Sequence, residues 1–126
     1  MKALIIDDSK FQRLAIQRAL SHAGYEVATA SDGEEGLQAA RASRPDIIVL
    51  DMMLPKVSGI DVLRALRGEA ATQAVPVIVL TGLSDRNKEK LIAEGASEFL
   101  EKSDGLLKDD CGSLMDAVAR VRAGRA

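Results

Sequence analysis

The chain has 126 residues, of which 47% are hydrophobic and 29% charged, and this length suits a single globular domain spanning residues 1–126. A formal net charge of −2 and a pI near 5.4 argue against direct binding of nucleic acid or of an anionic membrane surface. No apolar run approaches the roughly 20 residues that cross a bilayer, and the first run begins at Ala3. We therefore expect a cytoplasmic protein with neither a membrane span nor a cleaved leader. The single cysteine, Cys111, cannot form an internal disulfide.

Apolar runs alternate five times with segments whose apolar residues recur at helical spacing. This alternation predicts βαβ units around a parallel sheet, and hence an α/β fold. The second run, 25–30, is the most polar of the five, so we expect it to form an edge strand. The runs begin near residues 3, 25, 47, 77 and 99.

The first two predicted helices have recognisable ends. The first follows Ser9, a favourable N-cap, and stops at Gly24, a favourable C-terminal glycine. The second begins near Ser31, which with Glu34 resembles a capping box, and ends before Pro45. Each helix carries a stripe of apolar or small residues for packing on the sheet. These residues are Ile16, Ala19, Leu20 and Ala23 in the first helix and Gly33, Gly36, Leu37 and Ala40 in the second.

Three further helices are predicted along the second half of the chain. One follows the loop 52–59, and the last covers about 112–122. The helix between them, roughly 86–94, has few apolar residues and five charged ones, so we expect it to be held least firmly. The predicted buried faces are Val62, Leu63 and Leu66 in the third helix and Leu114, Ala117, Val118 and Val121 in the last.

Polar and charged residues end four of the five apolar runs. Asp7 and Asp8 follow the first run, Asp51 the third, Thr81 the fourth and Lys102 the fifth. If the runs are strands of one parallel sheet, these side chains gather at its carboxyl edge, where open α/β folds bind ligands. Three carboxylates brought together repel one another unless a cation lies among them. The sequence thus predicts a site for Mg²⁺ and a phosphoryl group, with Asp8 and Asp51 as direct ligands and Asp7 acting through water.

Five groups of residues stand in order behind the predicted strands: Asp7-Asp8, then Asp51, then Pro55 with Gly59, then Thr81-Gly82, and finally Lys102. Each group is common alone, whereas the ordered set is specific. Over nearly its whole length the chain resembles the receiver domain of two-component response regulators. The resemblance implies a doubly wound, five-stranded parallel sheet of the flavodoxin-like (βα)5 type, with strand order 2-1-3-4-5.

The resemblance also implies roles for individual residues. Asp51 is expected to be the nucleophile that accepts a phosphoryl group, as in other aspartyl-phosphate proteins. Lys102 and the Thr81 hydroxyl are expected to surround the phosphoryl oxygens together with Mg²⁺, and the main-chain carbonyl of Met53 is expected to be a further metal ligand. Phe99 is expected to follow Thr81 inward on activation, although core packing explains this aromatic residue equally well.

Partners follow from the same resemblance. The phosphoryl donor is expected to be a histidine kinase or a phosphotransfer protein, and the chain itself is a phosphoacceptor and not a true enzyme. A downstream effector protein is expected on the surface made by the fourth helix, fifth strand and fifth helix, and the sequence leaves dimerisation on activation open. Neither Met53 nor Leu83 offers a polar side chain to orient a hydrolytic water, so we expect slow self-dephosphorylation.

One residue departs from the family pattern, because Ser103 stands where a cis proline usually follows the lysine. A cis bond before serine costs about 3 kcal/mol, so we expect a trans bond or a rearranged loop over 103–111. This departure is the support for one alternative, a phosphorylation-independent receiver-like interaction module. The other alternative, an enzyme or flavin binder on the same fold, lacks both a glycine-rich phosphate loop after the first strand and a second acid two residues after Asp51.

Overall fold

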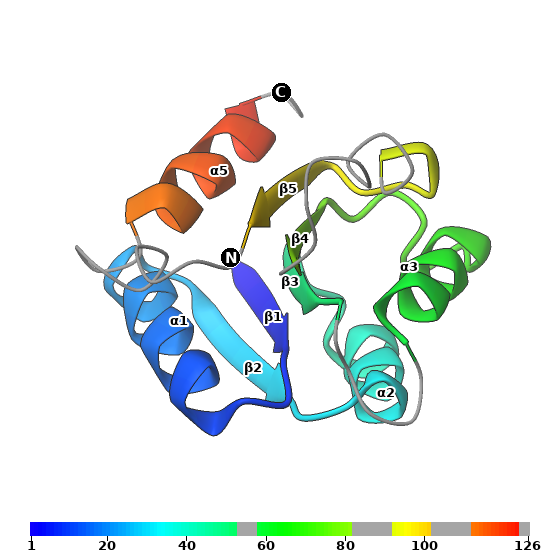
Figure 1. Cartoon of the computed structure of the whole chain (residues 1–126), viewed down its shortest axis with the longest axis horizontal. Helices are drawn as coiled ribbons and strands as arrows, with labels where there is room; N and C mark the ends of the chain where they lie inside the picture. The colour runs from blue at the N-terminus through cyan, green and yellow to red at the C-terminus, as the bar shows by residue number, and fades with distance from the viewer. Residues whose placement is uncertain (53–57, 82–91, 102–111, 124–126) are drawn as a thin grey trace.

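The computed structural model describes residues 1–52, 58–81, 92–101 and 112–123 (Figure 1). Strands and helices alternate along these residues, as the sequence predicts. The elements are β1 (Lys2–Ile6), α1 (Lys10–His22), β2 (Glu26–Ala30), α2 (Gly33–Ser43), β3 (Ile47–Asp51), α3 (Gly59–Gly68), β4 (Val77–Thr81), β5 (Glu98–Glu101) and α5 (Gly112–Ala123).

The five strands form one parallel sheet in the order β2-β1-β3-β4-β5, which confirms the predicted α/β fold and strand order. The polar strand β2 lies at the edge, as its composition predicts. Because every strand runs the same way, all five carboxyl ends meet at one edge of the sheet. The described residues that end these runs, Asp7, Asp51 and Thr81, therefore lie at the same edge of the sheet.

Two apolar layers hold the helices against the sheet. Successive strand residues point to opposite faces, so Ile5 and Val49 enter one layer while Leu4 and Ile48 enter the other. Helices α1 and α5 cover the first face, and α2 and α3 cover the second (Figure 1). The predicted buried faces of α3 and α5 are confirmed, since Val62, Leu63, Leu66, Leu114, Ala117, Val118 and Val121 are all buried. Among the described ranges, every helix is too short or too polar to span a lipid bilayer.

Helix α1 begins and ends as predicted. The Ser9 side chain accepts a hydrogen bond from the Gln12 N–H at 3.3 Å, and Gly24 has a φ of +96°, the left-handed conformation that glycine adopts most easily. Ala23 is the exception among the residues of this helix that are predicted to be buried. It is exposed because it forms the C-cap, where the chain has already turned away from the sheet.

The predicted capping box of α2 is wrong by one residue. The N-cap is Asp32, whose carboxylate accepts from the Glu35 N–H at 2.8 Å. Ser31 lies outside the helix and donates from its hydroxyl to the Glu35 carboxylate at 2.9 Å, so Glu35 and not Glu34 reaches back over the helix start. Both Ser31 and Asp32 are good caps, and the sequence does not distinguish the two registers.

The end of the chain is tied to the start of β2 through the single tyrosine. Tyr25 is buried, and its hydroxyl accepts a hydrogen bond from Arg122 Nη1 at 3.1 Å. The Arg122 guanidinium also lies 5.6 Å from the centre of the tyrosine ring, within the range of a cation–π contact. This contact joins α5 to the amino-terminal edge of the sheet.

Two predicted segments fall largely outside the described residues. Of the predicted helix 86–94, residues 92–94 are described; 92–93 are helical and 94 is already in a turn. The polar loop predicted over 103–111, including the Lys102–Ser103 junction, also lies outside the described residues.

Candidate metal centre

Three aspartates converge at the carboxyl edge of the sheet. Asp7 follows β1, Asp8 begins the turn into α1, and Asp51 is the last residue of β3. Each offers a carboxylate oxygen, and these oxygens all lie within 4.8 Å of one another. Asp7 and Asp51 are each only 1% exposed, whereas Asp8 is exposed to solvent. The structure therefore brings together the three carboxylates that the sequence predicts to meet.

This donor set fits a small, hard divalent cation. Mg²⁺ lies about 2.1 Å from its oxygen ligands, so two oxygens that share one ion are at most ~4.2 Å apart. The ligand oxygens of the aspartate cluster, Asp7 with Asp8 and Asp51, all lie within 4.8 Å of one another, which is the scale of such a site. Two buried and one exposed carboxylate also leave an open side for waters and for a phosphoryl group.

The turn between β1 and α1 fixes Asp7 through its main chain and its side chain. The Asp7 N–H donates to the carbonyl of Ala30 at 3.1 Å, which extends the pairing of β1 with β2 by one residue. One carboxylate oxygen accepts from the Ser9 N–H at 2.8 Å. The Asp7 carbonyl accepts from Arg13 Nη1 at 2.7 Å. The buried aspartate is thus held from three directions.

The turn after β3 is held by close packing of α3. The Met52 N–H donates to the Leu80 carbonyl at 3.0 Å, and the Gly59 N–H donates to the Met52 carbonyl at 3.3 Å. A Cβ added at Gly59 would lie 2.6 Å from Met52 Cα and 2.9 Å from the Asp51 carbonyl oxygen. Gly59, one of the residues singled out in the sequence, is therefore where a helix start packs directly against the backbone of the Asp51 strand. Ser58 caps this helix by accepting from the Asp61 N–H.

The remaining predicted site residues are placed only in part. Thr81 ends β4, and its Cα pairs with Glu101 of β5, one residue past the pairing of Asp51 with Leu80. Its backbone thus lies at the carboxyl edge, while its side chain lies outside the described residues, as do Met53 and Lys102.

Phe99 pairs with Val79 and packs, half-buried, against the layer under α2 and α3. This contact agrees with the core-packing interpretation of Phe99. The role of Phe99 in a switch stays a prediction.

Arg13 is a site neighbour that sequence reasoning missed. Its position in the first turns of α1, close behind the acidic pair, is visible in the sequence. Its partner is a main-chain carbonyl, which every residue carries, so the sequence does not indicate this hydrogen bond.

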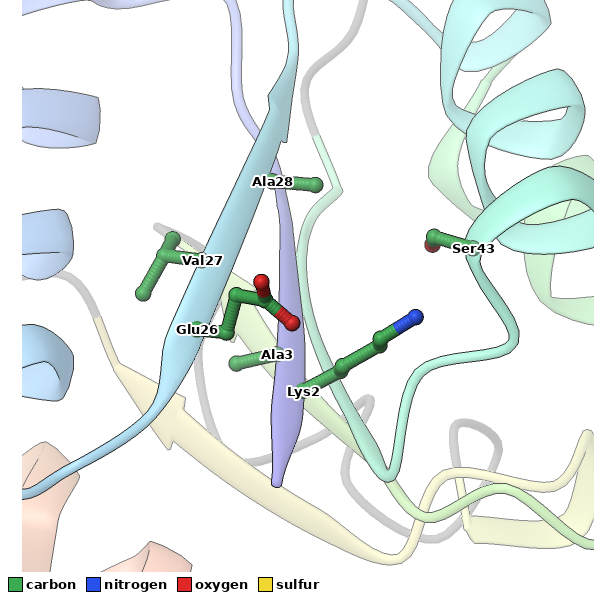
Figure 2. Close-up of a pocket in the computed structure, with 6 residues that line it drawn as sticks. All are labelled: Lys2, Ala3, Glu26, Val27, Ala28 and Ser43. Carbon is green, nitrogen blue, oxygen red and sulfur yellow. The ribbon is translucent and has the colours of Figure 1, made fainter.

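A separate hollow lies at the other end of the strands. Its volume is about 170 Å³, and its lining residues are Lys2, Ala3, Glu26, Val27, Ala28 and Ser43. Figure 2 shows the Lys2 side chain reaching from β1 toward the end of α2 that carries Ser43. Lys2 and Glu26 begin their strands, so this hollow lies at the amino-terminal edge and takes no part in the aspartate cluster.

The doubly wound parallel sheet with three aspartates at its carboxyl edge is an α/β domain with an acidic ligand site. Residues 3–108 match the model of the response regulator receiver domain, and the chain belongs to this family.

Curated relatives agree with this assignment. The chain is 40% identical to the alkaline phosphatase synthesis transcriptional regulatory protein PhoP of Bacillus subtilis over 80% of its own length and 42% of the relative. It is 38% identical to the transcriptional regulatory protein AfsQ1 of Streptomyces coelicolor over 95% of its length and 49% of that protein. The chain thus spans about half the length of the curated relatives it matches.

Solved structures match over nearly the whole of both chains. The chemotaxis response regulator CheY4 of Vibrio cholerae superposes with a TM-score of 0.85 at 33% identity, covering 95% of this chain and 97% of that one. The receiver domain of the sensor histidine kinase PA1611 from Pseudomonas aeruginosa gives a TM-score of 0.79 at 26% identity and covers 94% of each chain. That structure has a magnesium ion coordinated in its active-site cleft.

Proposed function

We propose that this receiver domain is a phosphorylation-activated signalling switch of a two-component system, which accepts a phosphoryl group from a histidine kinase, or from a phosphotransfer protein, onto Asp51. The observation that carries the proposal is the meeting of Asp7, Asp8 and Asp51 within 4.8 Å at the carboxyl edge of the sheet. Such a cluster provides a nucleophilic carboxylate together with ligands for the cation that would neutralise the charge.

Each residue of the site has a distinct task in this proposal. Asp8 and Asp51 hold Mg²⁺ directly, Asp7 holds it through water, and the Met53 carbonyl is a further ligand. The bound ion supplies positive charge to the phosphoryl oxygens during transfer. A carboxylate oxygen of Asp51 attacks phosphorus, the P–O bond forms as the P–N bond of the phosphohistidine breaks, and the electron pair returns to the imidazole.

The switch follows from the new charge. Lys102 and the Thr81 hydroxyl bind the phosphoryl oxygens, and Phe99 moves into the space that Thr81 leaves. The chain assists its own phosphorylation and dephosphorylation without acting as an enzyme on other substrates. It acts in the cytoplasm through a downstream effector protein that binds the surface made by the predicted fourth helix, β5 and α5. Its low net charge supports the absence of direct contact to nucleic acid or membrane.

The test is the intact mass of the protein after incubation with Mg²⁺ and acetyl phosphate. We expect the parent to gain one phosphoryl group, and Asp51→Asn or excess chelator to abolish the gain. Asp116→Asn is the matched control, because Asp116 is an exposed aspartate on α5 that should leave the gain intact. No gain in the parent would overturn the proposal in favour of a phosphorylation-independent interaction module.

A further inference from the structure

Arg13 reaches back from α1 to the strand end that carries the acidic pair. Its Nη1 donates to the Asp7 carbonyl at 2.7 Å, and the half-buried setting of this bond protects it from competition by water. The Arg13 N–H donates to the Ser9 carbonyl at 2.9 Å. Arg13 therefore binds both residues that flank Asp8: its side chain binds Asp7, and its backbone N–H binds Ser9.

Arg13 binds the carbonyl of Asp7, whereas the N–H and the carboxylate of Asp7 have other partners. The Asp7 N–H is bonded to Ala30 of β2, and the Asp7 carboxylate accepts from the Ser9 N–H. The Asp7 carbonyl belongs to the peptide that joins Asp7 to Asp8, so a change in its direction changes ψ of Asp7 and φ of Asp8 and with them the path of the turn. The bond from Arg13 opposes such a change because it fixes the direction of the Asp7 carbonyl.

The other cations of α1 do not behave in this way. Lys10 and Arg18 are exposed, and neither side chain forms a hydrogen bond or an ion pair with another described residue. Arg18 lies on the same helix as Arg13, so removing its side chain removes the same charge without touching the turn. The chain thus contains its own matched control.

We propose that Arg13 is a positioning residue for the aspartate cluster, which holds the Asp7–Asp8 turn in the conformation that binds a divalent cation before the cation arrives. The identification of that cation as Mg²⁺ rests on the proposed function. Arg13 touches the main chain and not the reacting atoms, so its effect is on pre-organisation. Outer residues that orient metal ligands typically change metal affinity by about 10- to 100-fold.

The charge of Arg13 and its hydrogen bond have opposite effects on cation affinity. A guanidinium near the site repels Mg²⁺, so loss of the charge alone would tighten binding, although salt screens this effect. Loss of the bond frees the turn and weakens binding. The positioning role therefore predicts the sign of the change as well as its size.

The test is a calorimetric titration of the full chain with Mg²⁺. We expect Arg13→Met to raise the Kd about 10-fold, Arg13→Lys to raise it less, and Arg18→Met to leave it unchanged or slightly lower. A Kd for Arg13→Met that equals or falls below that of the parent would overturn the inference. Thermal unfolding of each variant in chelator shows whether the fold is kept, and Arg13→Lys carries the comparison if Arg13→Met does not fold.

A second measurement needs no metal. In chelator, we expect hydrogen exchange of the Ser9 amide to be faster in Arg13→Met than in the parent and unchanged in Arg18→Met. If the parent binds no Mg²⁺, the proposed function fails, and the exchange rate of the Ser9 amide is then the test of the positioning role of Arg13. Equal exchange rates at Ser9 in the parent and in Arg13→Met would overturn that positioning role.

Discussion

Gly59 begins α3 directly against the main chain that carries Asp51. The atoms nearest to an added Cβ include Met52 Cα at 2.6 Å and the Asp51 carbonyl oxygen at 2.9 Å. These are backbone atoms, so rotation of a side chain cannot relieve the overlap. The helix start can approach the strand end this closely only because the residue has no side chain.

We therefore predict that Gly59→Ala lowers the free energy of unfolding by about 1–3 kcal/mol and slows phosphoryl uptake at Asp51, because the strand end must shift. Urea unfolding and the mass assay measure the two effects. Gly68→Ala at the other end of the same helix is the control, since nothing lies within 4 Å of its added Cβ. Because alanine restricts the unfolded chain, Gly68→Ala should be neutral or stabilising by up to ~1 kcal/mol. Equal losses at Gly59 and Gly68 would contradict the steric explanation.

The aspartate cluster could be predicted from the sequence because its members end buried strands. In a parallel sheet the position of a strand end is fixed by pairing, so Asp7 and Asp51 must meet once the strand order is known. Arg13 could not be predicted in the same way. A long side chain can reach many partners, and its bond to the Asp7 carbonyl depends on the exact path of the turn.

At the scale of a single element, α1 separates its two faces sharply. Ile16 is fully buried in the apolar layer that also contains residues of the sheet and α5, whereas Leu14 is 45% and Phe11 75% exposed. The helix contributes to the core through one stripe and presents apolar side chains to solvent on the other side. The loss in free energy of unfolding when a side chain of α1 is shortened to alanine should therefore depend on its burial and not on its residue type.

We predict that Ile16→Ala lowers the free energy of unfolding by about 2–5 kcal/mol, because it leaves a cavity in a packed layer. Leu14→Ala on the same helix should change it by no more than ~0.5 kcal/mol. Denaturant unfolding of both variants gives the comparison. A loss at Leu14 as large as that at Ile16 would show that the exposed face is covered in solution.

Helix ends show where sequence patterns decide and where they do not. Ser9 and Gly24 were predicted as the ends of α1, and both are confirmed by a cap bond and a left-handed glycine. At α2 two good caps are adjacent, and Asp32 takes the place predicted for Ser31. A charged acceptor near the positive end of the helix dipole is favoured, but the preference is too small to be read with certainty from residue types.

Tertiary contacts that join distant segments were outside the reach of the sequence patterns. Arg67 at the end of α3 donates to the carbonyls of Gly95, Gln73 and Val75, and burial lowers the pKa of its guanidinium below the ordinary value. Gly95 has a φ of +113° and lies so close that an added Cβ would overlap the Arg67 side chain. These bonds join α3 to the segments that enter β4 and β5.

At the scale of the whole molecule, the proposed binding of a cation by the aspartate cluster predicts that stability depends on that cation. Two buried carboxylates and one exposed carboxylate repel one another in the absence of a cation, and this repulsion opposes folding. A ligand that binds only the folded state stabilises it by about 2.7 kcal/mol at 100 times its Kd. Under the proposed function, folding and cation binding are therefore expected to be linked through these three side chains.

We predict that saturating Mg²⁺ raises the Tm of the parent by on the order of 5–10 °C. Asp51→Asn should melt higher than the parent in chelator, because one negative charge is removed, and should gain much less from Mg²⁺. Circular dichroism melts with and without chelator measure both effects. A parent Tm that does not respond to Mg²⁺, or an equal response in Asp51→Asn, would contradict this linkage.

The contact between Tyr25 and Arg122 has a consequence for fluorescence. The chain has one tyrosine and no tryptophan, so its intrinsic emission comes from Tyr25. This ring lies under α5 at the start of β2, and the five residues of that strand place it roughly 16 Å from the aspartate edge. A cation bound at Asp51 is too far away to quench it by contact. A change in tyrosine emission after phosphorylation would therefore report a change in the packing of α5 against Tyr25. Phosphorylation at the carboxyl edge would then alter the structure at the amino-terminal edge of the sheet.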